Sequence, residues 1–143
     1  VAVHTYSVNT GDLLLDALEK ATKKEKSIQT VVVYSHGTGD AISLDWNSGF
    51  YSTSATYSLN PGAVRTTDLA QMVEDGRISF TSEAKILLLS CNSASADNDK
   101  LSLAEEIADL TGVTTIGSDG LVEPINIDGK ESGKSSSTNQ FYG

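Results

Sequence analysis

The sequence predicts an α/β layer fold with a mostly parallel central sheet and a β-hairpin insertion. Strand-like apolar runs alternate with amphipathic helical segments along most of the chain. Two of these runs, residues 30–34 and 84–89, are almost continuously apolar, which is typical of strands covered on both faces. The chain has 143 residues, enough for one hydrophobic core. We therefore expect a single domain over residues 1–143, as a whole protein or as a fragment of a larger one.

The first half of the chain contains two predicted strands and a helix. In residues 1–8 the side chains follow the two-residue period of a strand. A helix follows, with Asp12 as its cap and with Leu14, Leu18 and Ala21 on one face. Residues 30–34 form the next expected strand, which is rich in β-branched side chains.

A hairpin is predicted between this strand and the second helix. Residues 42–46 and 51–59 each alternate between apolar and polar side chains, and residues 47–49 join them as a turn. Trp46, Tyr51 and Tyr57 either pack on one face of the hairpin or flank a substrate cleft. The turn at residues 60–62, Asn-Pro-Gly, ends the insertion.

Two further helix–strand units complete the prediction. The second helix opens at Thr67 or Asp68 and ends near Gly76, before the strand at residues 84–89. Ser102 and Glu105 form a capping box for the third helix. A short strand is expected at residues 113–116. Residues 124–143 are rich in Gly, Ser and Lys, and we expect a loosely structured tail there: a loop, a weak edge hairpin or partial disorder.

Composition excludes several classes of function. Ten Lys and Arg against nineteen Asp and Glu give a net charge of −9, which repels phosphate backbones and anionic lipid. We therefore expect neither nucleic acid nor a membrane as partner. One cysteine and two histidines exclude an internal disulfide and a multi-thiolate metal site, so we expect no cofactor and no metal. A composition rich in Ser, Thr, Asn and Gly is typical of exported bacterial proteins and suggests a secreted or periplasmic location.

Three polar residues that can support catalysis follow three predicted strands. His36, Cys91 and Asp119 each lie just beyond the carboxyl end of a strand. In parallel sheets these ends meet at one edge, where ligands bind. A cysteine thiolate beside a histidine base is a nucleophile, and the backbone N–H groups of Gly37 and Cys91 can form an oxyanion hole.

The residues around His36 and Cys91 resemble the caspase-like cysteine peptidases. The segment Val32-Val33-Tyr34-Ser35-His36-Gly37 is followed by Ile86-Leu87-Leu88-Leu89-Ser90-Cys91-Asn92-Ser93, with Cys91 55 positions after His36. In this family the histidine follows one central strand as His-Gly, and the cysteine follows the next strand about 50 residues later. The sequence is most similar to bacterial secreted caspase-like and clostripain-like domains, over residues 30–120.

The resemblance implies a fold, an activity and roles for four residues. The fold would be the three-layer caspase-like sandwich, and the activity would be cleavage of a protein or peptide substrate. Cys91 would be the nucleophile and His36 the general base and leaving-group acid, with the Gly37 and Cys91 amides holding the oxyanion. Asp119 occupies the place of an acidic residue in the S1 pocket of clostripain-like members, which would select Arg or Lys at P1.

Two other functions remain open from the sequence. The first is a caspase-like binding or toxin-associated module without turnover. The second is an α/β-hydrolase-type esterase, but Leu89 and Ser93 stand where a nucleophile elbow has glycines, and no histidine follows His36. Each candidate also has a purely structural interpretation: Cys91 as a buried small apolar residue, His36 as a turn residue, and Asp119 as a turn former.

Overall fold

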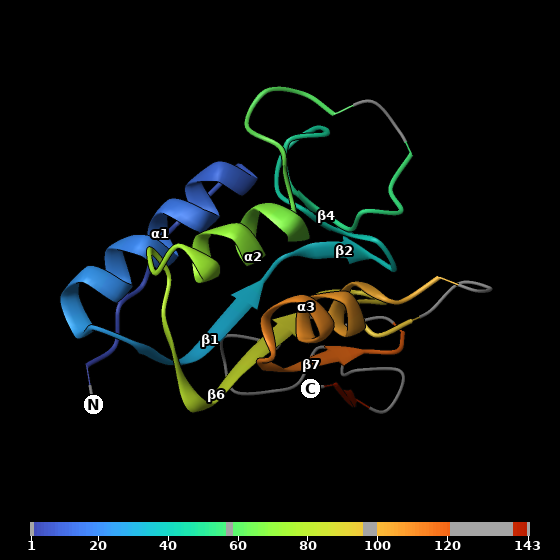
Figure 1. Ribbon diagram of the computed structural model, residues 1–143. Coiled ribbons are helices and arrows are strands. Elements are labelled where there is room, and N and C mark those ends of the chain that lie inside the picture. The colour runs from blue at the N-terminus through green and yellow to red at the C-terminus, as the bar shows by residue number, and fades with distance from the viewer. Residues whose placement is uncertain (1, 57–58, 96–99, 121–138, 143) are drawn as a thin grey trace, which may run out of the picture.

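The computed structural model describes residues 2–56, 59–95, 100–120 and 139–142. Its central sheet has the order β1 (Ile28–Tyr34), β6 (Phe80–Leu89), β7 (Thr114–Ser118) and β8 (Asn139–Tyr142). The first three strands are parallel and β8 is antiparallel to β7 (Figure 1). The predicted α/β class and the mostly parallel sheet are therefore confirmed. β8 is an edge strand, whereas residues 124–138 of the expected tail lie outside the described residues.

Three helices pack on one face of this sheet. They are α1 (Gly11–Glu25), α2 (Thr66–Glu74) and α3 (Leu103–Thr111). The helices and the alternate residues of β1 and β6 that face them share one hydrophobic core. This core includes Leu14, Leu69, Ile107, Val31, Val33, Ile86 and Leu88. Right-handed crossovers that proceed in one direction, from β1 to β6 to β7, place α2 and α3 on one face, and α1, which precedes β1, shares their core.

The opposite face of β1 is open, which corrects the expectation that the strands are covered on both faces. Val32 is 56% exposed and Tyr34 is 64% exposed. The continuous apolar run predicted burial, but a run of this kind does not say whether a second layer exists. Within the described residues the second helical layer of a three-layer sandwich is not present.

A second sheet follows β1 directly. It consists of β2 (His36–Thr38), β3 (Ala41–Ser43), β4 (Phe50–Tyr51) and β5 (Val64–Arg65), in that order. The pairing of β3 with antiparallel β4 confirms the predicted hairpin, although its strands are shorter than expected. Tyr51 is 3% exposed and packs in this part of the core, whereas Trp46 is 79% exposed and does not pack on a hairpin face. Tyr57 lies outside the described residues.

The predicted first strand is wrong. Residues 2–8 form no strand, and the chain instead runs beside α1, where the His4 ring lies 2.9 Å from a carboxylate oxygen of Glu25. The alternating pattern is present, but a strand needs a neighbour for its backbone hydrogen bonds, and the only strand paired with β1 in the described chain is β6.

The helix ends follow the sequence closely. α1 begins at Gly11 after Thr10, so Asp12 lies in the first turn of the helix and not at the cap. In that turn the Asp12 carboxylate accepts a hydrogen bond from the Leu13 amide at 2.8 Å. Ser102 caps α3 by accepting from the Glu105 amide at 3.2 Å, and Gly112 ends α3 with a φ of 72°. No helix in the described part of the chain is long and apolar enough to cross a membrane.

Candidate functional site

The register between β1 and β6 aligns His36 with Cys91. From Thr30 onward each residue of β1 pairs with the residue 55 positions later in β6, ending with Tyr34 opposite Leu89. A further hydrogen bond, from the Ser35 amide to the Leu89 carbonyl at 3.3 Å, extends the contact past the end of β1. Because His36 and Cys91 are also 55 positions apart, they occupy equivalent places just beyond two neighbouring strand ends.

Gly37 allows the two strand ends to lie directly against each other. A Cβ atom at Gly37 would be 2.7 Å from the Cβ of Ser90 and 3.1 Å from the carbonyl oxygen of Cys91. Real Cβ atoms do not approach Ser90 this closely, so any side chain at Gly37 would push the segment after β1 away from Cys91. Ser90 itself is fully buried, and its hydroxyl has no hydrogen-bond partner among the described residues.

Cys91 begins a tight turn that is anchored to the end of β7. The Asn92 amide donates to the Gly120 carbonyl at 2.7 Å, and the Ala94 amide donates to the Ser118 carbonyl at 2.9 Å. Asn92 has a φ of 58°, a left-handed conformation that asparagine tolerates better than most residues. The turn therefore brings the third strand end, with Asp119, beside Cys91.

A buried serine fixes the inside of this turn. The Ser93 hydroxyl donates to the carbonyls of Leu88 and Ser90 at 3.2 and 3.1 Å and accepts from the Ser118 amide at 3.0 Å. Ser93 is fully buried. This hydroxyl gave no signal in the sequence, because its contacts depend on the register of β6 and β7.

Asp119 is exposed at the third strand end, but its side chain is held. The Ser95 hydroxyl donates to its Oδ1 atom at 2.7 Å. The structure thus brings the three predicted strand ends together at one sheet edge, with the Cys91 turn between the His36 segment and Asp119. Ser95, like Ser93, is a residue of this cluster that the sequence did not predict, because both lie in the turn after β6 and in no strand or helix.

The two candidate catalytic side chains differ in exposure. His36 is exposed on the first residue of β2, and Cys91 is partly buried. Within the described residues the His36 ring makes no hydrogen bond. The fold therefore places the His36 backbone beside the Cys91 turn, but the two side chains are not joined by a hydrogen bond. No group of three His, Cys, Asp or Glu side chains in the described part could hold a metal ion.

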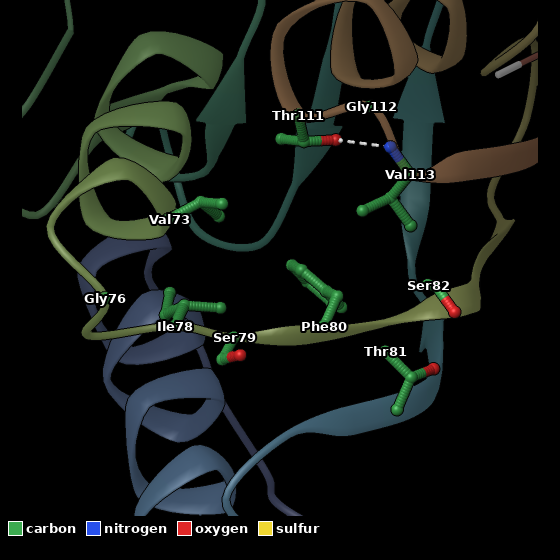
Figure 2. A pocket seen from close by; sticks show the side chains of 10 residues that line it. All are labelled: Val73, Gly76, Ile78, Ser79, Phe80, Thr81, Ser82, Thr111, Gly112 and Val113. Atoms are coloured by element: carbon green, nitrogen blue, oxygen red, sulfur yellow. Dashed lines mark hydrogen bonds between the residues drawn. The ribbon is translucent and has the colours of Figure 1, made fainter.

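A cavity of about 310 Å³ lies at the opposite end of the sheet. Figure 2 shows it between the start of β6 and the ends of α2 and α3, with Phe80 and Ile78 pointing into it and Thr111 accepting a hydrogen bond from the Val113 amide. None of its lining side chains is titratable: they are Val73, Ile78, Ser79, Phe80, Thr81, Ser82, Thr111 and Val113, with Gly76 and Gly112. It therefore offers no acid, base or thiol.

Comparisons with known proteins give no family for the chain. No protein-family model matches it, and neither a curated protein nor a solved structure matches it.

Proposed function

We propose that the chain is a cysteine endopeptidase of the caspase-like type, with His36 and Cys91 as its catalytic dyad. The observation that carries this proposal is the common offset of 55 positions, which relates β1 to β6 and also His36 to Cys91. The close packing of Gly37 on Ser90 and Cys91 supports it, since a glycine is required there for the two segments to meet.

The proposed reaction needs only these side chains and water. The Cys91 sulfur attacks the substrate carbonyl carbon to form a tetrahedral oxyanion, which collapses to a thioester as the peptide C–N bond breaks. His36 takes the thiol proton and gives it to the leaving amine. Water, deprotonated by His36, then attacks the thioester and releases the carboxylic acid, and the proton returns to the Cys91 sulfur.

Gly37 is a suitable donor to the oxyanion. It pairs with Ile42 in the β2–β3 hairpin, whose two-residue turn lies between Thr38 and Ala41. Residues flanking such a turn form the hydrogen-bonded pair, so the next pair, Gly37 with Ile42, is the non-bonded one. The Gly37 amide is therefore directed away from β3. The Cys91 amide would be the second donor.

Asp119 would bind a basic side chain of the substrate at P1. Its carboxylate is exposed and lies at the same sheet edge as Cys91. Arg and Lys are the side chains whose positive charge complements a carboxylate, and arginine can engage it through two parallel hydrogen bonds. The net charge of −9 further favours a cationic substrate.

Cleavage of a peptide library, analysed by mass spectrometry, tests the proposal. The purified chain should cut after Arg or Lys, and the Cys91→Ala and His36→Ala variants should not. The matched control is His4→Ala, which removes the other exposed histidine and should retain the activity. Cysteine-dependent cuts after other residues would remove Asp119 from the site but keep the dyad, whereas cleavage by Cys91→Ala would exclude the peptidase.

A module with this fold but without turnover is the second candidate. Two observations favour it: the His36 ring makes no hydrogen bond among the described residues, and the cavity of about 310 Å³ lies at the other end of the sheet. Absence of any cleavage by the wild-type chain, together with no reaction of Cys91 with peptidyl alkylating agents, would support this module over the peptidase.

A further inference from the structure

We infer that Ser95 is a positioning residue for substrate selection: its hydroxyl holds the Asp119 carboxylate in place to bind an arginine or lysine side chain next to the scissile bond. This inference rests on the proposed peptidase function and assigns a role to a residue outside the dyad and its oxyanion donors. It depends on how the Ser95 side chain, the Asp119 side chain and their backbones are fixed relative to the Cys91 turn.

Ser95 is itself immobilised on two sides. Its amide donates to the Asn92 carbonyl at 2.9 Å, which closes the turn that begins at Cys91. Its carbonyl oxygen faces Gly39, where an added Cβ would approach it to 2.9 Å. The Ser95 backbone thus lies between the nucleophile turn and the hairpin that carries His36, and its hydroxyl projects from a defined position.

The backbone of Asp119 is fixed by its two neighbours. Ser118 accepts a hydrogen bond from the Ala94 amide at 2.9 Å, and Gly120 accepts one from the Asn92 amide at 2.7 Å. Both bonds come from the same turn as Cys91. The remaining freedom of Asp119 is rotation of its side chain, and the hydrogen bond from Ser95 to Oδ1 restricts it.

Among the described residues the Asp119 carboxylate accepts a hydrogen bond from Ser95 and forms no ion pair. Ser95 is a neutral donor that satisfies part of one oxygen, while a carboxylate can accept about four hydrogen bonds in all. In the part of the chain that the structure describes, no lysine, arginine or histidine forms an ion pair with Asp119: the ion pairs there join His4 to Glu25, Lys20 to Asp16 and Arg77 to Glu19. A carboxylate oriented in this way beside the nucleophile is what a cationic side chain requires.

Holding the carboxylate in advance favours binding because the substrate does not then lose free energy in ordering it. A serine with a merely structural role would change stability when replaced, without changing the preference between charged and neutral substrates. The quantity that distinguishes the two roles is therefore the ratio of reaction rates with a charged and a neutral substrate, measured on variants that remain folded.

The experiment measures how fast Cys91 is alkylated by two peptidyl chloromethyl ketones that differ only in having arginine or norleucine next to the reactive group. The thiolate displaces chloride, and mass spectrometry follows the adduct. Iodoacetamide, which has no side chain to recognise, gives the intrinsic thiol reactivity of each variant. The variants are Ser95→Ala, Ser95→Thr and Asp119→Asn, with Ser7→Ala as the matched control on an exposed serine outside the site. Far-ultraviolet circular dichroism establishes that each variant is folded.

The wild-type chain should react faster with the arginine ketone than with the norleucine ketone. Ser95→Ala should lower this ratio by about threefold to tenfold, the effect of one hydrogen bond. Asp119→Asn should abolish the preference, while Ser95→Thr, which keeps a hydroxyl, and Ser7→Ala should retain it. An arginine preference unaffected by Ser95→Ala would overturn the inference and leave the peptidase standing. Peptidyl ketones that alkylate Cys91 of the folded chain no faster than Cys91 of the urea-unfolded chain, relative to iodoacetamide in each state, would overturn both.

Discussion

A buried glutamate on α3 gives the most quantitative test of the fold around the site. Glu106 is 8% exposed and accepts hydrogen bonds from the Thr53 amide at 2.7 Å, from the Thr53 hydroxyl at 3.1 Å and from the Thr66 hydroxyl. It thereby ties α3 to the loop after β4 and to the first residue of α2. Arg65 holds the same loop by donating to the Ser52 carbonyl at 2.7 Å.

The expected cost of Glu106→Ala follows from these partners. Thr66 is 1% exposed, so its hydroxyl would lose its acceptor in a buried place, at about 1–3 kcal/mol. The Thr53 amide lies on an exposed residue and can turn to water, so its loss is nearer 1 kcal/mol. Removing an acidic residue from the first turn of α3 adds about 0.3–1 kcal/mol. The free energy of unfolding should therefore fall by about 2–5 kcal/mol, adding these estimates.

Urea unfolding followed by circular dichroism measures this change. Glu106→Gln keeps the shape and one acceptor oxygen and should cost less than half as much as Glu106→Ala. Thr53→Ala, which removes only the exposed hydroxyl bond, should cost under about 1 kcal/mol. Amide hydrogen exchange should also become faster at Thr53 in Glu106→Ala. A loss below about 1 kcal/mol for Glu106→Ala, or unchanged exchange at Thr53, would refute the reasoning.

Three further perturbations test other parts of the structure. Gly37→Ala should lower stability by about 1–3 kcal/mol in urea unfolding, because the new Cβ overlaps Ser90, and should slow alkylation of Cys91 by peptidyl ketones; wild-type behaviour in both would contradict the close packing. Arg77→Ala should raise the pKa of the Glu19 carboxyl, which the hydrogen bond from Arg77 lowers, and a carboxyl NMR titration that shows no rise would argue against this pair. Since a lowered folded-state pKa stabilises at higher pH, any stability lost in this variant should be seen at neutral pH and vanish as the pH falls through that pKa. Leu103→Ala, at a side chain with no exposure, should cost about 2–5 kcal/mol in thermal or urea unfolding, and a smaller loss would mean that the core collapses around it.

Local signals in the sequence predicted the elements whose ends are marked by capping residues. The Ser102 cap and Gly112 bound α3 where the pattern indicated, because capping depends on hydrogen bonds within a few residues. Residues 2–8 show the converse. Their alternation is a correct description of the sequence but forms no strand, since a strand depends on a partner that local pattern does not supply.

Burial was predictable for much of the helical faces, though not for Leu110, which is 43% exposed, and not for the sheet faces. Leu14 and Ile107 are buried, since the period of an amphipathic helix marks which side meets the core. Val32 and Tyr34 are exposed although they stand in an apolar run. Whether the second face of a sheet is covered depends on where the other elements pack, and the sequence of β1 is the same in either case.

For the candidate site, the sequence by itself determined which residues can act and that each follows a strand: His36, Cys91 and Asp119. Only the tertiary structure decided that β1 and β6 pair with an offset of 55 positions, that Gly37 packs on Ser90, and that Ser95 reaches Asp119. The physical reason is that residue type sets chemical capability, whereas proximity between distant segments arises from strand register and close packing, which are properties of the whole fold.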